Sequence, residues 1–224
     1  MGIDLGINRP VTLYIEGEKR QEQVEVNDKI QHDRMRLMRQ RKSIQQSLKY
    51  AKGGHGSSKK LAKMEDFKLK EKNWAQTINH VISANVIKIA LSKNVGVIKM
   101  EDLSGITTNA TDYFFKSWGY YQLQNNIKYK AEMAGIKILW VNPKDTSREC
   151  PTCKIVDANN RSKEDVKVFT CKNEYCEDYM KFKDADLVGA INISRREGIG
   201  EKPKSKKTIK KKNIEEKMKK DLVV

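Results

Sequence analysis

The opening stretch MGIDLGINRPVTLYIEG (Met1–Gly17) predicts two short β-strands around an Asn-Arg-Pro turn at 8–10. The segment QVEVN at Gln23–Asn27 predicts a third strand, so the chain begins as a three-stranded antiparallel meander. Asp4 is expected in the middle of the first strand, flanked by residues that should be buried. Because a charged group in such a place is costly unless it has a partner or binds a cation, Asp4 is the first candidate for a functional residue.

Two long helices are expected after the meander. From Asp28 to Tyr50, apolar residues recur at helical spacing among many Arg and Lys, which predicts a helix with one narrow buried stripe. Residues 51–58 (AKGGHGSS) predict a break, and a second helix is expected from about Lys59 to Ser92. The second half of that helix is more apolar and should be packed, whereas its first half should be solvated or lie on nucleic acid. The stripe of the first helix consists of Ile30, Met35, Leu37, Met38, Ile44 and Leu48.

The remaining apolar runs predict the rest of a mixed α/β sheet. The segments VGVIKMED (Val95–Asp102) and IKILWVNP (Ile136–Pro143) predict buried strands, with a helix from about Tyr113 to Ala134 between them. The predicted order is therefore β-β-β-α-β-α-β, followed by a cysteine-containing insert and a last helix. Two of the strands carry carboxylates, at Asp4 and at Glu101.

The chain is strongly basic, with 45 Lys and Arg against 29 Asp and Glu and a net charge of +16. Such a surplus favours a polyanionic partner, nucleic acid being the first choice and a merely soluble basic surface the alternative. Because the sequence shows neither a signal peptide nor an apolar run long enough to span a bilayer, we expect a cytoplasmic protein without a membrane partner. The stretch 197–224 has too few apolar residues for a core and predicts a disordered or loosely helical basic tail.

All four cysteines fall in one stretch, as Cys150-x2-Cys153 and Cys171-x4-Cys176. In a reducing compartment, two close-spaced pairs are more typical of metal ligands than of disulfides. Four thiolates leave no open coordination position, so the pattern predicts a structural zinc ribbon and not a catalytic zinc centre. Three basic residues in this stretch are candidate nucleic-acid contacts: Lys154, Arg161 and Lys163.

Three acids beside apolar runs, Asp4, Glu101 and Asp186, are candidates for a second metal site. If they converge at one end of the sheet, they can hold two divalent cations for phosphodiester cleavage. Spacing alone leaves other roles open, because each acid can also cap a strand or loop, and Asp184 or Asp186 can be the N-cap of the last helix. GIDLGIN also resembles the first phosphate loop of the actin and sugar-kinase superfamily, but the second glycine-rich loop of that superfamily is missing here.

Taken together, five motifs resemble the RuvC-type nuclease half of the TnpB (OrfB) transposon proteins and the compact type V CRISPR effectors. They cover about Met1 to Arg196 and read GIDLGIN, VGVIKMEDLSGI, FFKSWGYYQLQNNIKYKAEMAGIKILWVNP, TSRECPTC and DADLVGAINISRR. The GGHG break and the aromatic patch at 118–121 favour the CRISPR effectors of the two. The resemblance implies an RNase H-like (RuvC) core at 1–146 with long basic helices at 29–92, a zinc ribbon at 147–180, a final catalytic helix at 181–196 and the tail at 197–224.

The resemblance also implies a DNA endonuclease that depends on Mg²⁺ or Mn²⁺ and is directed by guide RNA. On residue matching, Asp4 and Asp186 hold one ion, and Asp4 and Glu101 hold the other. The wedge and recognition domains of the family have no counterpart in the sequence, so we expect an N-terminally truncated fragment. The chain departs from the family in two places: Val188 and Gly189 stand where the family has Asn and Ala, and the second cysteine pair is wider than usual. Asp186 is matched to the third acid because the following stretch, AINIS, agrees with the family again.

Basic residues of the first long helix and aromatic residues near the later one are further candidates for nucleic-acid contact. Most of the aromatic residues are nevertheless expected to form the core face of their helix, with one or two exposed. The competing interpretation is a non-catalytic DNA- or RNA-binding relic that keeps the zinc ribbon and the basic surface. The sequence leaves the guide RNA, the target motif and the oligomeric state open. The candidate contacts are Arg34, Arg36, Arg39, Arg41, Lys42, Trp118 and Tyr121.

Overall fold

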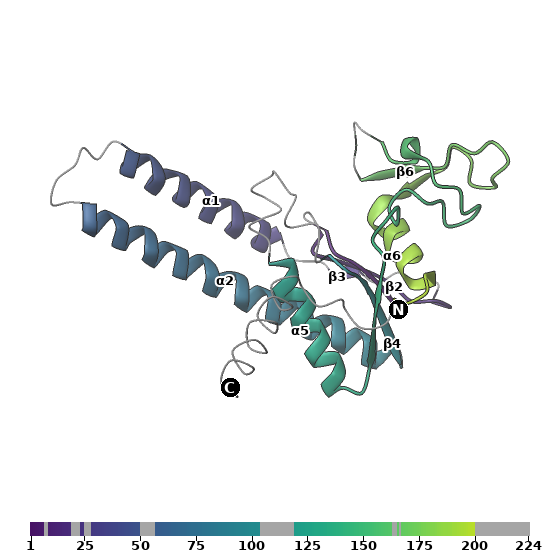
Figure 1. Cartoon of the computed structure of the whole chain (residues 1–224), viewed down its shortest axis with the longest axis horizontal. Coiled ribbons are helices and arrows are strands. Elements are labelled where there is room, and N and C mark those ends of the chain that lie inside the picture. The colour runs from purple at the N-terminus through teal and green to yellow at the C-terminus, as the bar shows by residue number, and fades with distance from the viewer. Residues whose placement is uncertain are drawn as a thin grey trace, which may run out of the picture.

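A five-stranded mixed sheet forms the centre of the protein (Figure 1). The computed structural model describes residues 1–6, 9–18, 23–24, 28–49, 57–103, 119–162, 165 and 167–199. The strand order is β3-β2-β1-β4-β5, in which the first three strands pair antiparallel and β4 lies parallel to both β1 and β5. The strands are β1 (Gly2–Asp4), β2 (Val11–Tyr14), β3 (Gln23–Val24), β4 (Val97–Glu101) and β5 (Lys137–Val141).

The strands follow the sequence predictions with one shift. The antiparallel meander is confirmed, although Asn8 of the predicted turn lies outside the described residues. Asp4 is the last residue of β1 and not its middle, because the chain leaves the sheet at Leu5. Since β4 ends at Glu101, both acids stand where their strands end.

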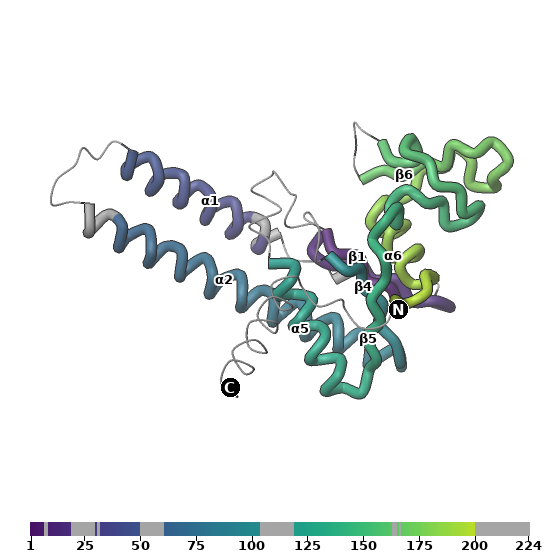
Figure 2. The backbone as a smooth tube through the Cα atoms, viewed as in Figure 1, coloured from purple at the N-terminus to yellow at the C-terminus, as the bar shows by residue number. Residues whose placement is uncertain are grey.

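Two long helices form an arm that extends from the sheet (Figures 1 and 2). Helices α1 (Asp28–Lys49) and α2 (Ser57–Ser92) run side by side. Residues 51–56 of the break predicted between them lie outside the described residues, whereas its last two residues, Ser57 and Ser58, already belong to α2. Leu37 of the predicted stripe is buried, but Met35 is 45% exposed, so that part of the prediction was wrong. Met64 and Phe67 are buried in the first half of α2, so this half is packed in part and not simply solvated.

One face of the sheet is covered by the second half of α2 and by α5 (Tyr120–Met133). The predicted start of α5, at 113–118, lies outside the described residues. Because α2 and α5 each carry apolar side chains at helical spacing, they bury a continuous core against the sheet. This core includes Ile82, Val86 and Ala90 of α2, Leu123 and Ile127 of α5, and Ile3, Leu13, Ile98, Met100 and Trp140 of the sheet.

Helix α6 (Ala185–Arg195) packs on the sheet against β1, β2 and β4 (Figures 1 and 2). Its approach to β1 is very close, since a Cβ atom placed on Gly2 would lie 2.6 Å from the Ser194 nitrogen and nearer still to the Ala190 carbonyl oxygen. A Cβ placed on Gly189 would lie 2.9 Å from the Asp4 Oδ2. Glycine at these two positions therefore lets the helix backbone rest directly on the strand.

A small subdomain lies between β5 and α6 in the sequence and carries all four cysteines. It contains the hairpin of β6 (Val168–Thr170) and β7 (Phe182–Asp184) and a short 3₁₀ helix, η1 (Ala158–Asn160). Its core joins Phe169 and three of the cysteines to Ala185 and Val188 of α6. Val188 is fully buried there, so the residue that departs from the family motif packs the helix against the subdomain.

The described part of the chain ends along the outer edge of β5. The Ile199 N–H donates to the Trp140 carbonyl oxygen at 2.7 Å, and the predicted tail beyond it lies outside the described residues from 200 onward. Within the described ranges, none of the helices combines the length and the apolar character that a membrane-crossing segment requires.

We expect Gly2→Ala to lower the free energy of unfolding by about 1–3 kcal/mol, because the added methyl group must push β1 away from the α6 backbone. Urea unfolding followed by circular dichroism measures the change. Gly96→Ala is the matched control, since nothing lies within 4 Å of a Cβ at that position and its φ is not positive. This control should be neutral or stabilise by about 0.4–1 kcal/mol. Equal effects of the two substitutions would contradict the close approach described above.

Candidate functional site

Three carboxylates from separate elements come together beside α6. In the parallel pairing of β1 and β4, Ile3 lies opposite Met100, so Asp4 and Glu101 follow at the same edge of the sheet. Asp186 is the second residue of α6, the helix whose Gly189 packs against the Asp4 carboxyl group. The charges of Glu101 and Asp186 both act on Asp4, which places the three predicted acids in one neighbourhood.

The electrostatics of this neighbourhood favour a bound cation. Burial raises the pKa of Asp4 well above its usual value, and the negative charges of Glu101 and Asp186 raise it further. The positive charge of Arg161, which lies in the cysteine-containing subdomain, lowers the pKa of Asp4 in part. Because like charges held close together disfavour ionisation, a positive ion at this point would relieve the repulsion.

Glu101 and Asp186 also have raised pKa values, each mainly because of burial. For Glu101, a hydrogen bond from the Thr146 hydroxyl and the charge of Arg196 work in the opposite direction. For Asp186, the charge of Asp184 raises the pKa further, whereas nearby cations lower it, Arg9 and Arg161 among them. All three acids are thus harder to ionise in the folded protein than in an unfolded chain.

Asp184 caps the N-terminus of α6, a role for which the sequence allowed either Asp184 or Asp186. Its side chain accepts hydrogen bonds from the N–H groups of Asp186 and Leu187, at 3.0 and 3.3 Å, so it is the N-cap of α6. It also forms an ion pair with Arg9 of the turn between β1 and β2. Because Asp184 fills the cap position, the carboxylate of Asp186 is not needed there and can face the other acids.

The three acids supply the kind of ligands that Mg²⁺ and Mn²⁺ prefer, namely carboxylate oxygens. In the described part of the chain, the four cysteines are the one group of three or more His, Cys, Asp or Glu residues that lie close enough together to hold a metal ion, and the three acids do not form such a group.

The four cysteines form a compact cluster. Their sulfur atoms all lie within 4.8 Å of one another, with Cys150 and Cys176 at 3.8 Å and Cys153 and Cys171 at 3.7 Å. These distances exclude disulfides, whose sulfurs are about 2.05 Å apart. Four thiolates arranged as a tetrahedron about 2.3 Å from a zinc ion would stand about 3.8 Å apart, so the cluster has the size of a zinc site.

The thiols of the cluster differ in acidity. Although burial opposes it, hydrogen bonds from the backbone at Ile155, from Asn173 and from neighbouring thiols bring the pKa of Cys153 to about 7. Burial raises the pKa of Cys171. Metal ligation requires the thiolate form of each cysteine.

The predicted nucleic-acid contacts of α1 fall into two groups. Arg36, Arg39 and Lys42 are exposed, as expected for residues that meet a polyanion. Arg34 and Arg41 instead line a cavity of about 250 Å³ between α1 and α2, where Arg41 pairs with Glu71 of α2 at 3.2 Å. These two arginines therefore also take part in the contact between α1 and α2.

The other predicted contacts are distributed over the rest of the molecule. Tyr121 is 62% exposed whereas its neighbour Tyr120 is buried, as expected for a helix with one core face. Lys154 is exposed on the cysteine-containing subdomain. Lys163 and Trp118 lie outside the described residues. Arg161 differs from the others because its charge reaches both Asp4 and Asp186.

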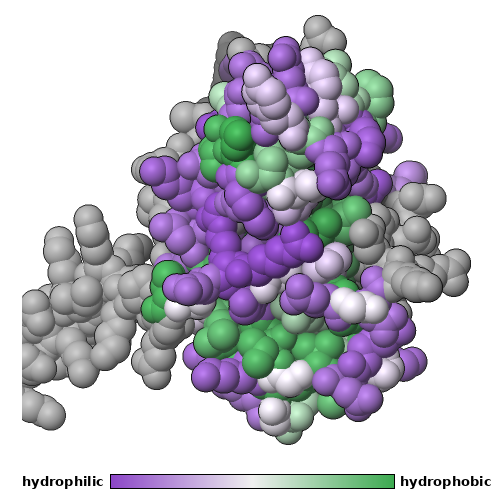
Figure 3. Space-filling model, turned by 90° about the vertical axis from the view of Figure 1, so that its right-hand side faces the viewer, coloured by the Kyte–Doolittle hydropathy of each residue, from purple (hydrophilic) through white to green (hydrophobic). Residues whose placement is uncertain are grey.

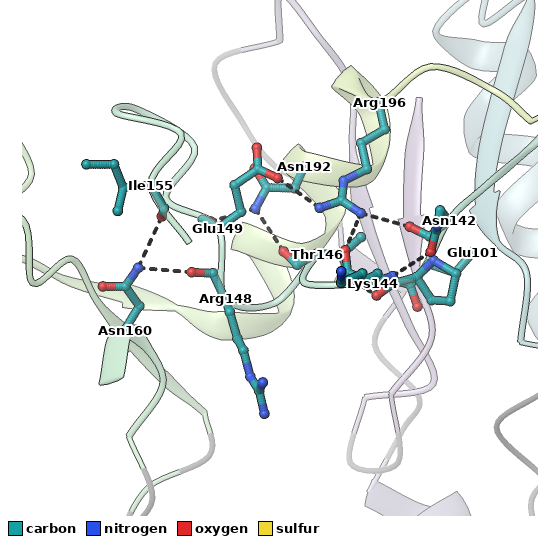
Figure 4. A network of polar contacts seen from close by, with 11 residues as sticks. Glu101, Asn142, Lys144, Thr146, Arg148, Glu149, Ile155, Asn160, Asn192 and Arg196 are labelled. Atoms are coloured by element: carbon teal, nitrogen blue, oxygen red, sulfur yellow. Dashed lines mark hydrogen bonds and ion pairs between the residues drawn. The ribbon is translucent and has the colours of Figure 1, made fainter. Parts of the chain in front are cut away.

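Three residues that support the acids could not be recognised from the sequence. Thr146 donates a hydrogen bond to Glu101, and Asn192 and Arg196 tie the loop around Thr146 to α6 (Figure 4). Thr146 begins the TSRECPTC motif and Asn192 belongs to AINIS, so both lay within stretches that the sequence had already singled out. Without the fold, nothing connected the two stretches to Glu101.

Comparisons with known proteins converge on one group. The Cas12f1-like, TNB domain family matches residues 120–193. A Cas12f1 endodeoxyribonuclease of Syntrophomonas palmitatica is 34% identical over 175 residues, which are 77% of this chain and 35% of that protein. A TnpB-like protein of Methanocaldococcus jannaschii is 32% identical over 140 residues, which are 59% of this chain and 46% of that protein.

The solved structures agree in fold. A Cas12f ternary complex matches with a TM-score of 0.71 and 23% identity over 88% of this chain and 38% of the other. A Cas12f1–sgRNA–target DNA complex matches with a TM-score of 0.66 and 21% identity over 87% of this chain and 49% of the other. The chain therefore spans less than half the length of these relatives.

In Mg²⁺-free buffer we expect Asp4→Asn to stabilise the protein at neutral pH by about 1 kcal/mol or more, because it removes a buried charge that lies near the charges of Glu101 and Asp186. An acid whose pKa is raised on folding costs no stability below its unfolded pKa. The cost grows as the pH rises from there through the folded pKa, so the advantage of Asp4→Asn should be small at pH 4 and full at pH 8.

Urea unfolding at the two pH values measures this difference. Asp178→Asn is the control with the opposite sign, because hydrogen bonds from Lys183 and Thr152 lower the pKa of Asp178 and the charge is favourable there. A loss of stability in Asp4→Asn at pH 8 would show that burial and the two neighbouring acids do not disfavour the Asp4 carboxylate as described.

Proposed function

Because this chain belongs to the family of the TnpB-like proteins and the compact type V CRISPR effectors, we propose that it is the nuclease region of an RNA-guided DNA endonuclease. The observation that carries the proposal is the convergence of Asp4, Glu101 and Asp186 from β1, β4 and α6. The proposed fold is RNase H-like (RuvC), and the strand order β3-β2-β1-β4-β5 with α6 on the sheet supports it.

The proposed domain division follows from the same elements. The nuclease core takes residues 1–146 and the final helix at 181–196, and the zinc ribbon takes 147–180. The shared core of Phe169, Ala185 and Val188 supports a ribbon that is packed firmly on the final helix.

Asp4, Glu101 and Asp186 are the proposed ligands of two Mg²⁺ or Mn²⁺ ions. Such ions, when bound, activate a water molecule and stabilise the departing 3′ oxygen of a DNA phosphodiester. Asp4 is the acid on which the charges of the other two act, so it is suited to bridge both ions. Glu101 and Asp186 complete one site each, and the Glu101 carboxylate also accepts a hydrogen bond from the Thr146 hydroxyl.

Arg161 is proposed to bind the scissile phosphate. Its guanidinium belongs to the ribbon, yet its charge acts on Asp4 and Asp186 across the boundary with the core. Arginine suits this role, because its planar fork can bind two phosphate oxygens and it stays charged at every working pH. DNA that lies across the acids would therefore touch the core and the ribbon together.

Guide RNA and target DNA are the proposed partners, as in the Cas12f1–sgRNA–target DNA complex that shares the fold. The exposed Arg36, Arg39 and Lys42 of α1 offer phosphate contacts, and Tyr121 offers a stacking surface. The face that carries the ribbon and α6 has a broad hydrophilic band across its middle, with hydrophobic side chains gathered below it (Figure 3).

The nuclease proposal predicts that the purified chain cuts labelled single-stranded DNA with Mg²⁺ or Mn²⁺ and that Asp4→Ala, Glu101→Ala and Asp186→Ala each abolish cutting. Loss of a metal ligand removes the chemistry itself, so we expect a decrease of at least about 100-fold in each variant. Gel analysis of end-labelled DNA gives the rate. Glu132→Ala is the matched control, because it removes one exposed acid from the last turn of α5.

If the three variants cut as fast as the wild type, the metal site is placed wrongly. If the wild type does not cut but binds DNA in a salt-sensitive manner without Mg²⁺, the competing interpretation of a non-catalytic binding module is favoured. Binding measured by fluorescence anisotropy at two salt concentrations separates these outcomes.

The cysteine cluster is proposed to hold one structural zinc ion, and elemental analysis should find about one zinc per chain. The double substitution of Cys150 and Cys171 by Ser should abolish this zinc and unfold the ribbon, because the thiols are half of the small core around Phe169. Near-UV circular dichroism and limited proteolysis report the unfolding. A zinc-free protein with an unchanged spectrum would refute the zinc ribbon.

A further inference from the structure

The carboxylate of Glu101 is held by a side chain from the loop that follows β5. The Thr146 hydroxyl lies within hydrogen-bond distance of Glu101 Oε1, and Thr146 is only 4% exposed (Figure 4). On the other side, the Gln124 amide of α5 donates to the Glu101 carbonyl oxygen at 2.7 Å. The backbone and the side chain of Glu101 are therefore fixed by different elements.

The Thr146 hydroxyl lies near two hydrogen-bond acceptors. Its hydroxyl also lies 3.1 Å from the Pro143 carbonyl oxygen, but a hydroxyl has only one hydrogen to donate. A hydrogen bond to an ionised carboxylate is about twice as strong as one to a neutral carbonyl. When Glu101 is ionised, the Thr146 hydroxyl therefore donates its hydrogen bond to Glu101 and not to Pro143.

Asn192 of α6 fixes Thr146 in turn. Its side-chain amide donates both hydrogens, one to the Thr146 carbonyl oxygen and one to the Glu149 carbonyl oxygen, each at 2.8 Å (Figure 4). Asn192 is 1% exposed, so no water competes for these hydrogen bonds. Because Thr146 and Glu149 are three residues apart, this one amide fixes the loop at two points.

The same loop is clamped a second time by Arg196 at the end of α6. The Arg196 guanidinium donates to the Asn142 carbonyl oxygen at 2.8 Å and pairs with the Glu149 carboxylate at 2.8 Å. Asn192 lies in α6 and Arg196 is its C-cap residue, so both hold the loop against the helix that carries Asp186. Hydrogen bonds thus connect α6, the helix that carries Asp186, through Thr146 to the carboxylate of Glu101.

We propose that Thr146 is a positioning residue that holds the Glu101 carboxylate beside Asp4, and that Asn192 holds Thr146 in register with the helix that carries Asp186. The inference rests on the proposed metal site and adds to it the residues that set its geometry. A carboxylate without this support can rotate about its side-chain torsions, and support of this kind is typically worth 10- to 100-fold in metal affinity or activity.

Thr146→Val tests the proposal, because valine has nearly the same shape as threonine but cannot donate a hydrogen bond. On the full chain, we expect a Mn²⁺ affinity about 10- to 100-fold weaker by calorimetry. In the cleavage assay, the rate at saturating DNA should fall by a similar factor while the KM for DNA stays unchanged. Thr146→Ser retains the hydroxyl and should restore both values to within about threefold of the wild type.

Thr12→Val is the matched control. Thr12 is 1% exposed and pairs with Asp4 in the β1–β2 register, but in the described part of the chain its hydroxyl has no hydrogen-bond partner. The same substitution there should leave Mn²⁺ affinity unchanged. Thermal unfolding of all variants identifies any general loss of structure.

Equal Mn²⁺ affinity of the wild type and Thr146→Val would overturn the positioning role and leave the metal site itself standing. A wild type that neither binds Mn²⁺ nor cuts DNA would instead overturn the proposed function. In that case crystal structures of the two proteins still decide the role of Thr146. We expect the Glu101 carboxylate to leave its place beside Asp4 in Thr146→Val, and an unchanged carboxylate position contradicts the proposal.

Discussion

The close contact between α6 and β1 is the constraint on which the rest of the structure depends. Gly2 and Gly189 allow it, because a Cβ at either position would meet the backbone of the helix or the carboxyl group of Asp4. The contact brings Asp186 to the strand that ends in Asp4, and the parallel pairing of β1 with β4 adds Glu101. One packing arrangement therefore assembles three acids whose residues are far apart in the sequence.

This assembly works against the stability of the metal-free protein. Burial raises the pKa of all three acids, and the charges of Glu101 and Asp186 raise that of Asp4 further, so the fold holds charges together that would separate in an unfolded chain. The surroundings compensate in part: Arg9 pairs with Asp184 at the start of α6, and Arg161 and Arg196 bring positive charge to the acids. Unfavourable electrostatics that a cation would relieve are typical of a site kept for function.

Much of the fold could be predicted from the sequence, because the spacing of apolar residues and the composition of a segment indicate its local structure. The meander, both long helices, β4 with its terminal Glu101 and the cysteine pairs all follow from patterns of neighbouring residues. The support of Glu101 by Thr146 and Asn192 could not be predicted, since residues separated by 45 positions meet only after the chain has folded. Val188 and Gly189 looked like departures from the family motif, yet each has a packing role that only the structure reveals.

The cysteine cluster and the acids are linked by the way in which α6 is stabilised. Helix α6 spans only Ala185–Arg195, and a helix of this length is marginal on its own, so its position depends on its tertiary contacts. Ala185 and Val188 in its first turn pack into the core that the cysteines build around Phe169. Asp186 lies between these two residues. A metal that orders the cysteines would therefore also order the turn that presents Asp186, even though it takes no part in the chemistry at the acids.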